Sequence, residues 1–271
     1  MDNRPIGVFD SGMGGLTALR QLVRLLPNEN IIYFGDTGRV PYGARSSDTI
    51  VKYARQDMSF LMESDPKAIL IACGTVSTTA LPILMREYEL PVYGVVEPAV
   101  AAALKATKNQ RVGIIGTKAT IRSGSYADMI RYLNSGIEVF SKACPLFVPL
   151  VEDGRVRPDD PVLNVLIDEY LSGMVEAGVD TVILGCTHYP LLSDAIASYM
   201  GDGVQLIDTG LESSLALREH LSINGLLADR QGSGRISYYV SDSAADFKAL
   251  ASVFLGSEIV TDVHRVDIDK Y

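Results

Sequence analysis

Two cysteines in this chain of 271 residues occupy positions from which a thiol can act on a ligand. Cys73 follows the apolar run 68–72, and Cys186 follows the β-branched run 181–185. Short runs of this kind, closed by a polar turn, are typical of buried parallel strands, and open α/β sheets bind ligands at such strand ends. We expect Cys144, which lies beside a proline in another apolar segment, to pack as a small apolar side chain.

Three kinds of chemistry are open to a pair of strand-end thiols. A metal site requires three or four ligands at close spacing, such as C-x-x-C, but the chain has three histidines and only His188 lies near a cysteine. A redox pair is also usually C-x-x-C, whereas Cys73 and Cys186 lie in different halves of the sequence. The third kind, two acid/base thiols that face each other across a shared cleft, requires no short spacing. Simple burial of each thiol in the core remains the alternative to all three.

Opposed thiols suit one reaction in particular, racemisation at an α-carbon. One group removes a proton from one face, and the other returns a proton to the opposite face, so the substrate need not turn over. A free cysteine has a pKa of about 8.5 and is only a few per cent thiolate at pH 7, so neighbouring groups must assist. We expect Asp10 and Glu152 on one side, and His188 on the other, to hold or relay these protons. A capping or core role for the histidine is the competing interpretation.

A glycine-rich turn, residues 10–15, follows the first expected strand, 6–9, and opens a helix with an apolar stripe. Free backbone N–H groups at such a turn suit a phosphate or a carboxylate. The turn lacks the G-x-G-x-x-G spacing, and no acidic residue follows a second strand in the dinucleotide manner, which disfavours a dinucleotide. A small carboxylate ligand and a plain strand-to-helix turn both remain compatible with this segment.

The second expected strand, residues 30–34, leads into a polar loop, 35–43, that is long for a connection between a strand and a helix. Proline and glycine punctuate this loop, so we expect its shape to be fixed. Asp36 and Tyr42 fit two roles equally well, as ordinary turn residues or as ligand contacts.

The same alternation of strand, loop and helix runs through both halves of the chain and predicts an α/β fold, with a domain boundary near residue 97. Further strands are expected at residues 68–72, 91–96, 111–117, 137–140, 181–185, 204–208, 236–242 and 258–261. Further helices are expected at residues 46–62, 99–106, 160–177, 211–223 and 244–255, with one that ends near residue 200 and one that passes through Leu84 and Tyr88 after the polar run 74–79. Residues 144–154 are expected to be irregular, and the polar residues 229–235 to form an exposed loop.

The composition narrows the classes of function. A hydrophobic content of 47% allows a sizeable core. A net charge of −9 and a pI of about 4.9 argue against a nucleic-acid partner, although a local field still permits an anionic substrate. No apolar run reaches the roughly 18 residues of a membrane span, and the N-terminal residues show no signal-peptide pattern. We therefore expect no membrane partner, a cytoplasmic location, and no disulfide framework.

Five segments, taken together, resemble the bacterial glutamate racemases of the cofactor-independent Asp/Glu racemase family. They are Asp10-Ser11-Gly12, the loop from Asp36 through Pro41-Tyr42-Gly43, Ala72-Cys73-x-Thr75, residues 116–120, and Gly185-Cys186-Thr187-His188-Tyr189-Pro190. The similar segments occur in the same order as in the family, and the resemblance extends from residue 6 to about residue 255. It implies two pseudo-symmetric, open-sheet (flavodoxin-like) α/β domains with the active site in the cleft between them. The implied division is residues 1–97 plus 210–271 for the first domain and 98–209 for the second.

The resemblance also implies roles for individual residues. Cys73 and Cys186 would be the two proton-transferring thiols, assisted by Asp10, Glu152 and His188. The implied substrate contacts are Asp10, Ser11, Pro41, Tyr42, Gly43, Gly74, Thr75, Thr117, Thr187 and His188. The implied activity interconverts L-glutamate and D-glutamate without cofactor or metal, and supplies D-glutamate for peptidoglycan synthesis. The family also suggests a homodimer.

One position departs from the family's pattern. The family usually has Asn after the first cysteine, and this chain has Gly74. A missing hydrogen bond costs about 0.5–1.5 kcal/mol unless water or a backbone N–H substitutes for it. The departure leaves two alternatives open. One is a racemase of the same family that acts on aspartate or another amino acid, and the other is a carboxylate-binding protein that uses the cleft without turnover.

Overall fold

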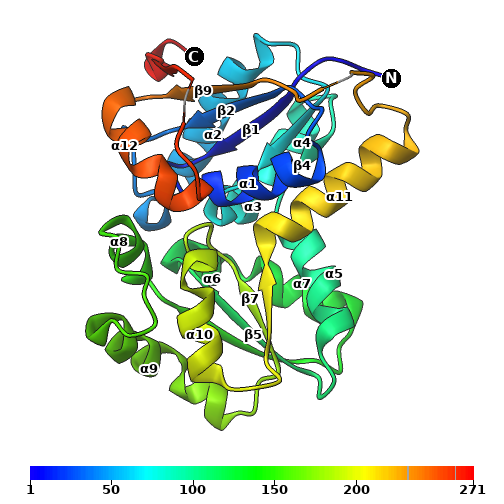
Figure 1. Ribbon diagram of the computed structural model, residues 1–271. Helices are drawn as coiled ribbons and strands as arrows, with labels where there is room; N and C mark the ends of the chain where they lie inside the picture. Colours follow the sequence, from blue (N-terminus) through cyan, green and yellow to red (C-terminus); the bar gives the residue numbers. More distant parts are fainter. Residues whose placement is uncertain (231, 260) are drawn as a thin grey trace.

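The protein is built on two parallel β-sheets, each covered by helices, in a computed structural model that describes residues 1–230, 232–259 and 261–271 (Figure 1). In this part of the chain the first sheet has six strands, in the order β10-β9-β2-β1-β3-β4. Its strands are β1 (Ile6–Asp10), β2 (Ile31–Gly35), β3 (Ala68–Ile71), β4 (Val92–Tyr93), β9 (Ile236–Val240) and β10 (Val263–Arg265). All the pairings are parallel, so these strands end at the same edge of the sheet.

The second sheet has four strands among the described residues, in the order β6-β5-β7-β8, and it is also parallel. Its strands are β5 (Arg111–Gly116), β6 (Glu138–Ala143), β7 (Thr181–Leu184) and β8 (Gln205–Asp208). The strand before Cys73, β3, lies between β1 and β4, and the strand before Cys186, β7, lies between β5 and β8. The α/β class predicted from the sequence is confirmed, and both cysteines follow interior strands.

Complete burial explains why these strands lack the alternation of polar and apolar residues. Every residue of β1, β3 and β7 is buried. Because helices cover both faces of a parallel sheet, side chains on both faces of each strand must be apolar or must have hydrogen-bond partners.

Helices surround each sheet. Those of the first half are α1 (Leu16–Leu25), α2 (Ser47–Met62), α3 (Gly74–Thr79), α4 (Leu81–Glu87) and α12 (Ala244–Leu255), with short 3₁₀ turns η1 (Tyr42–Ala44) and η3 (Ile268–Lys270). Those of the second half are α5 (Val96–Ala106), α6 (Lys118–Ser123), α7 (Ser125–Leu133), α8 (Phe147–Glu152), α9 (Pro161–Glu176) and α10 (Ser193–Met200), with η2 (Tyr189–Leu192).

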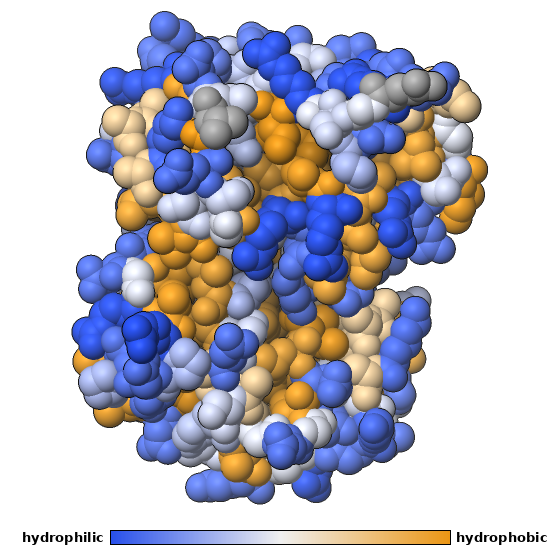
Figure 2. Space-filling model, viewed as in Figure 1, coloured by the Kyte–Doolittle hydropathy of each residue, from blue (hydrophilic) through white to orange (hydrophobic). Residues whose placement is uncertain are grey.

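One helix, α11 (Thr209–Ile223), ties the two halves together. It leaves β8 of the second sheet and packs against both α1 and α5 (Figure 1). Asp208 caps its start by accepting hydrogen bonds from the backbone N–H groups of Gly210 and Leu211. Gly210 approaches α1 so closely that a Cβ there would lie 2.9 Å from Ala18. Between the halves the surface is hollowed, and apolar residues gather at this waist (Figure 2).

Two sequence predictions fail where a proline stands near the start of a helix. Residues 144–154 were expected to be irregular, but α8 forms there with Pro149 as its third residue. Likewise the strand expected at 91–96 is short, because α5 already begins at Val96, with Pro98 as its third residue. The first N–H groups of a helix have no partner within it, so a proline in the first turn loses no hydrogen bond.

Other boundaries also differ from expectation. The polar run 74–79, expected to precede a helix, itself forms α3, and after Ala80 the expected helix follows as α4, with Pro82 in its first turn. The strand expected at 137–140 extends as β6 to Ala143. The edge strand expected at 258–261 was wrong for the described residues of that range, and the edge strand is β10, at Val263–Arg265. Val260, in that range, and Gln231, in the loop expected at 229–235, lie outside the described residues. No helix in the described part of the chain is both long enough and apolar enough to cross a membrane.

Candidate active site

Both strand-end thiols line a single cavity of about 390 Å³. The cavity lies where the loops that follow β1, β2 and β3 of the first sheet meet those that follow β5 and β7 of the second, together with the segment that carries α8. Its lining residues are Ser11, Gly12, Met13, Val40, Pro41, Tyr42, Gly43, Ala44, Cys73, Gly74, Thr75, Thr117, Lys118, Pro145, Val148, Pro149, Glu152, Gly185, Cys186, Thr187 and His188. Every site residue that the family resemblance implied is among them except Asp10, and Asp36, which fitted either a turn or a ligand contact, is also not in the lining.

Cys73 stands just before α3 and is only 5% exposed. Its Sγ donates a hydrogen bond to the hydroxyl of Ser11, at 3.3 Å. Burial raises the pKa of the Cys73 thiol to about 12, and the negative charge of Asp10 acts in the same direction. At neutral pH this thiol therefore holds its proton and is placed to donate it.

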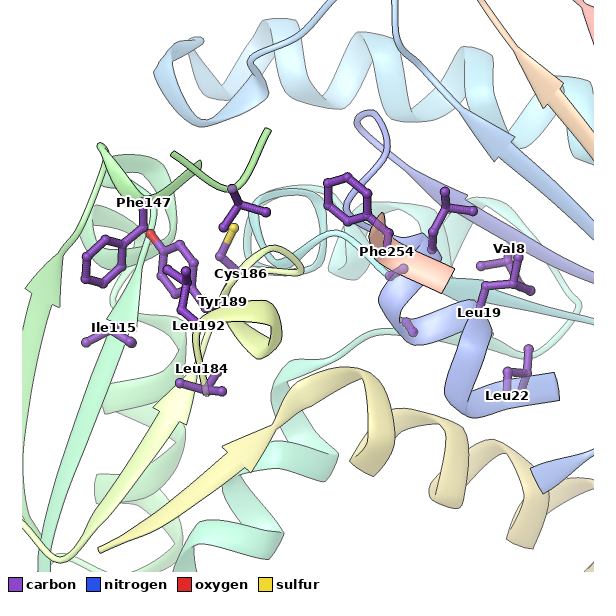
Figure 3. Packing of buried hydrophobic residues seen from close by; sticks show 14 of the residues in the cluster. Val8, Leu19, Leu22, Ile115, Phe147, Leu184, Cys186, Tyr189, Leu192 and Phe254 are labelled. Atoms are coloured by element: carbon purple, nitrogen blue, oxygen red, sulfur yellow. The ribbon is translucent and has the colours of Figure 1, made fainter. Parts of the chain in front are cut away.

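Cys186 has a different set of neighbours. Figure 3 shows it beyond the end of β7, with Tyr189 and Leu192 next to it and Phe147 on the far side of Tyr189, and all four belong to one core cluster. The Nδ1 atom of His188 lies 3.8 Å from its Sγ, and Nε2 of the same imidazole lies 3.1 Å from Oε1 of Glu152. Thiol, imidazole and carboxylate thus form a chain across the wall of the cavity.

The charge state of His188 follows from this chain. Burial by itself would lower the pKa of the imidazole, but hydrogen bonds to Cys186 and Glu152 and the negative charges nearby raise it to about 10. Phe254 of α12 packs edge-on against the imidazole, with ring centroids 5.4 Å apart. His188 is therefore protonated at neutral pH, next to the sulfur of Cys186.

Asp10 lies behind the cavity wall instead of in it. The side chain is 1% exposed, and its Oδ2 accepts a hydrogen bond from the backbone N–H of Gly12. The hydroxyl of Thr187 lies 3.5 Å from Oδ1. Burial raises the pKa of this carboxyl above its usual value, although the charge of His188 opposes the effect. Asp10 thus links the glycine-rich turn of the first half to the Cys186 loop of the second.

The expected grouping of the acids was wrong for Glu152. The sequence analysis placed Glu152 with Asp10 and opposite His188, whereas Glu152 bonds to His188 on the Cys186 side. The reason is α8, which was not expected and which carries Glu152 at its last position.

Three threonine hydroxyls form a polar wall from both halves. Thr75 and Thr117 lie 3.0 Å apart, Thr120 lies 3.0 Å from Thr117, and Thr75 lies 3.5 Å from Thr120. Thr120 and the cavity-lining Lys118 were not assigned as site residues, although both belong to the 116–120 segment. Phe254, Val148 and Pro149 were also missed, because nothing near them in the sequence distinguishes them from core residues.

Three glycines let the two halves approach closely around the cavity. A Cβ on Gly74 would overlap the carbonyl oxygen of Gly185, and a Cβ on Gly14 would overlap the side chains of Thr187 and His188. A Cβ on Gly43 would lie 2.9 Å from Cβ of Thr117. The absent side chain at position 74 thus allows backbone contact next to both thiols.

The described side chains around the cavity do not form a set of metal ligands. Among the residues that the structure describes, no three His, Cys, Asp or Glu side chains are grouped so that they could hold a metal ion. The polar groups of the cavity are instead suited to a small acidic molecule and to proton transfer.

Comparison with known proteins places the chain in a family. A model of the Asp/Glu/hydantoin racemases matches residues 6–212. A curated glutamate racemase from Geobacter metallireducens is 44% identical over 266 residues, which cover 98% of this chain and 97% of that protein. The crystal structure of glutamate racemase from Francisella tularensis in complex with D-glutamate superposes with a TM-score of 0.92 at 41% identity, and covers both chains completely. The glutamate racemase from Thermus thermophilus, in complex with β-chloro-D-alanine, gives 0.88 at 42% identity, again over both complete chains.

Fold and site together define an α/β protein that brings two buried thiols, one from each sheet, to a single small cavity. The matched family model and the full-length relatives then settle its membership: the chain belongs to the Asp/Glu/hydantoin racemase family. The resemblance noted from the sequence motifs is confirmed.

The first prediction concerns the His188–Glu152 contact. Glu152→Gln keeps an acceptor but removes a negative charge, so the pKa of His188 should fall from about 10 by roughly one pH unit. If turnover requires protonated His188, the alkaline decline of kcat should move to lower pH by the same amount. Asp153→Asn, which neutralises the neighbouring exposed acid, is the matched control. An alkaline limb at the same pH in all three proteins would contradict the assignment.

The second prediction concerns Gly74. Gly74→Ala forces the backbone at Cys73 or at Gly185 to shift, because the new methyl group would overlap the Gly185 carbonyl. We expect turnover to fall by roughly tenfold or more, since proton transfer depends on near-contact geometry. Gly173→Ala, in the middle of α9 where a Cβ meets nothing within 4 Å, should leave turnover unchanged. Full activity of Gly74→Ala would show that close approach at this position is not required.

Proposed function

We propose that the chain is a glutamate racemase, which interconverts L-glutamate and D-glutamate without a cofactor. The observation that carries this proposal is the pair of strand-end thiols, from two different sheets, in the lining of one small cavity. Relatives of the same name match nearly the whole chain, and one of them was crystallised with D-glutamate. The thiol pair separates this proposal from that of a protein that only binds carboxylates, because binding alone does not require two thiols.

In the proposed mechanism each thiol serves one enantiomer. When the α-proton faces Cys186, the thiolate of Cys186 removes it, and the Sγ–H of Cys73 delivers a proton to the opposite face. The product then leaves Cys73 as thiolate and Cys186 as thiol, which is the form that acts on the other enantiomer. One proton is taken and one is given in each direction, so no external acid or base is consumed.

We assign the supporting roles as follows. His188, held by Glu152, supplies positive charge and a proton next to Cys186. Asp10 and Ser11 lie on the Cys73 side, where the hydroxyl of Ser11 can return a hydrogen bond once Cys73 is a thiolate. The hydroxyls of the threonines and the backbone of the loop at 41–43 contact the carboxylates of the substrate. The residues proposed as substrate contacts are Ser11, Pro41, Tyr42, Gly43, Gly74, Thr75, Thr117, Thr187 and His188. Asp10, which the family resemblance also implied as a contact, does not line the cavity and is not proposed as one.

Several broader features form part of the same proposal. The first domain would comprise residues 1–97 and 210–271, and the second 98–209, a division that agrees with the strands of the two sheets. The family resemblance supports a cytoplasmic homodimer whose D-glutamate enters peptidoglycan synthesis.

The decisive experiment follows the α-hydrogen. Incubation of the pure protein with L-glutamate in D₂O, without added cofactor, should yield D-glutamate that carries deuterium at the α-carbon. Chiral chromatography and proton NMR measure the two outcomes independently. The same assay with L-aspartate tests the alternative substrate. If neither D-glutamate nor deuterium at the α-carbon appears at high protein concentration, the proposal is refuted. Turnover of aspartate alone would favour an aspartate racemase of the same family.

Substitution of the thiols tests their roles. Cys73→Ala and Cys186→Ala should each lower racemisation by roughly 10²–10⁴-fold, the usual contribution of a general acid or base, and leave binding of glutamate measurable by calorimetry. Cys144→Ala is the matched control, because Cys144 is buried but does not line the cavity, and it should retain activity. Comparable losses in all three variants would indicate a packing effect instead of proton transfer.

A further inference from the structure

A second group of buried acids lies directly behind one wall of the cavity. Asp36, in the loop after β2, and Asp57, on α2, have fully buried side chains and do not line the cavity. Both reach the hydroxyl of Tyr42, whose own exposed fraction is 1%. Arg39, 12% exposed, completes the group. We call these four residues the Tyr42 cluster.

One cation serves the two acids of the Tyr42 cluster. Arg39 donates from Nε to Oδ2 of Asp36, at 2.6 Å, and from Nη2 to Oδ1 of Asp57, at 3.0 Å. Its Nη1 donates to Gln56, and its guanidinium lies over the ring of Tyr53, 4.1 Å from the centroid. With both acids ionised the cluster would carry one uncompensated negative charge in a buried place, which is costly.

The contacts of the Tyr42 hydroxyl indicate which carboxylate oxygen would carry a proton that removes the uncompensated charge of the cluster. It contacts both Oδ2 of Asp36 and, at 3.2 Å, Oδ2 of Asp57, but it has one hydrogen to donate. If Asp57 carries a proton on Oδ2, then Asp57 donates to Tyr42 and Tyr42 donates to Asp36. Both contacts of the Tyr42 hydroxyl are then hydrogen bonds. Burial raises the pKa of Asp57 well above its usual value, and the charge of Asp36 adds to the effect, against a smaller opposing effect of Arg39.

The Tyr42 cluster is connected to the substrate cavity through the chain itself. Tyr42 begins η1, and residues 41–44 all line the cavity. Its ring packs on Tyr53 of α2, with centroids 5.3 Å apart, while its hydroxyl is held by acids from outside the cavity. The position of this wall therefore depends on how the hydroxyl is bonded.

We propose that Asp57 is a positioning residue for the racemase reaction: as an uncharged carboxylic acid it donates a hydrogen bond to Tyr42 and thereby holds residues 41–43 against the substrate. Asp57 touches neither the substrate nor the thiols, so its effect passes through Tyr42. The kinetic part of this inference rests on the proposed function, whereas the protonation of Asp57 does not.

Three substitutions test the positioning role. Asp57→Asn preserves the arrangement, because its carbonyl accepts from Arg39 and its amide donates to Tyr42, so kcat and KM should stay within about twofold. Asp57→Ala removes the donor, and Tyr42→Phe removes the hydroxyl between the acids. Both should raise KM for the two enantiomers by roughly tenfold, with a smaller change in kcat. Asp48→Asn, the same chemical change on an exposed side chain of α2, should have no effect.

The results separate the alternatives. A loss in Asp57→Asn as large as that in Asp57→Ala would show that the charge of Asp57 is required, and would overturn the inference. An unchanged KM in both Asp57→Ala and Tyr42→Phe would exclude a positioning role. If Asp57→Ala does not fold, Asp57→Asn and Tyr42→Phe still decide the question.

The protonation state has a test that does not involve catalysis. At neutral pH the infrared difference spectrum between the unmodified protein and Asp57→Asn should contain the carbonyl band of a protonated carboxylic acid, which the variant lacks. No such band should appear in the difference between the unmodified protein and Asp48→Asn. Absence of the band for Asp57 would overturn the inference even if the protein racemises glutamate. Its presence, in a protein that fails to racemise glutamate, would refute the proposed function alone.

Discussion

Removal of water from the two thiols is the constraint on which the rest of the site depends. Cys73 and Cys186 are both almost completely buried, and for Cys73 burial, together with the negative charge of Asp10, raises the pKa of the thiol to about 12. A sulfur in such surroundings stays protonated unless its neighbours supply compensating charge or hydrogen bonds. His188 with Glu152 lies beside Cys186 on one side, and on the other the hydroxyl of Ser11 accepts a hydrogen bond from the Cys73 thiol. The glycine contacts between the halves help to keep water out, because Gly74 meets the backbone of Gly185 while Gly14 and Gly43 meet side chains of the second half.

Buried acids near the cavity are held by hydrogen bonds in a similar way, although Oδ1 of Asp36 has no partner among the described residues. Asp10 accepts a hydrogen bond from the glycine-rich turn, and its pKa is raised by the same desolvation that acts on Cys73. The Tyr42 cluster places two further acids around one guanidinium and one hydroxyl. In both places a carboxyl group that does not line the cavity fixes a loop that does. The shape of the cavity is thus determined by polar contacts outside it as well as by the residues in its lining.

The sequence was most informative where local chemistry and periodicity agree. The β-branched runs before Cys73 and Cys186 predicted interior strands, because complete burial removes the alternation of an exposed sheet. The glycine-rich turn and the loop at 35–43 predicted cavity residues for the same local reason. Prediction failed for α8 and for the start of α5, each of which carries a proline in its first turn, where no hydrogen bond is lost. It named Glu152 as a site residue but grouped it with Asp10, and it missed Phe254. The positions of both beside His188 depend on how distant elements pack, which no spacing in the sequence records.

The two halves of the molecule share an α/β architecture with a thiol at a strand end, but the groups around the two thiols differ. One thiol is paired with a hydroxyl from a glycine-rich turn, and the other with a charged imidazole that α8 and α12 hold in place. The L and D enantiomers of a substrate therefore meet different chemical surroundings, so the two directions of the reaction do not have identical chemical steps. The overall equilibrium between mirror images must still be even, since their free energies in water are identical. Any advantage that one direction gains in its chemical step is thus balanced elsewhere in the cycle, in binding, in release, or in the return of the sulfurs to their starting forms.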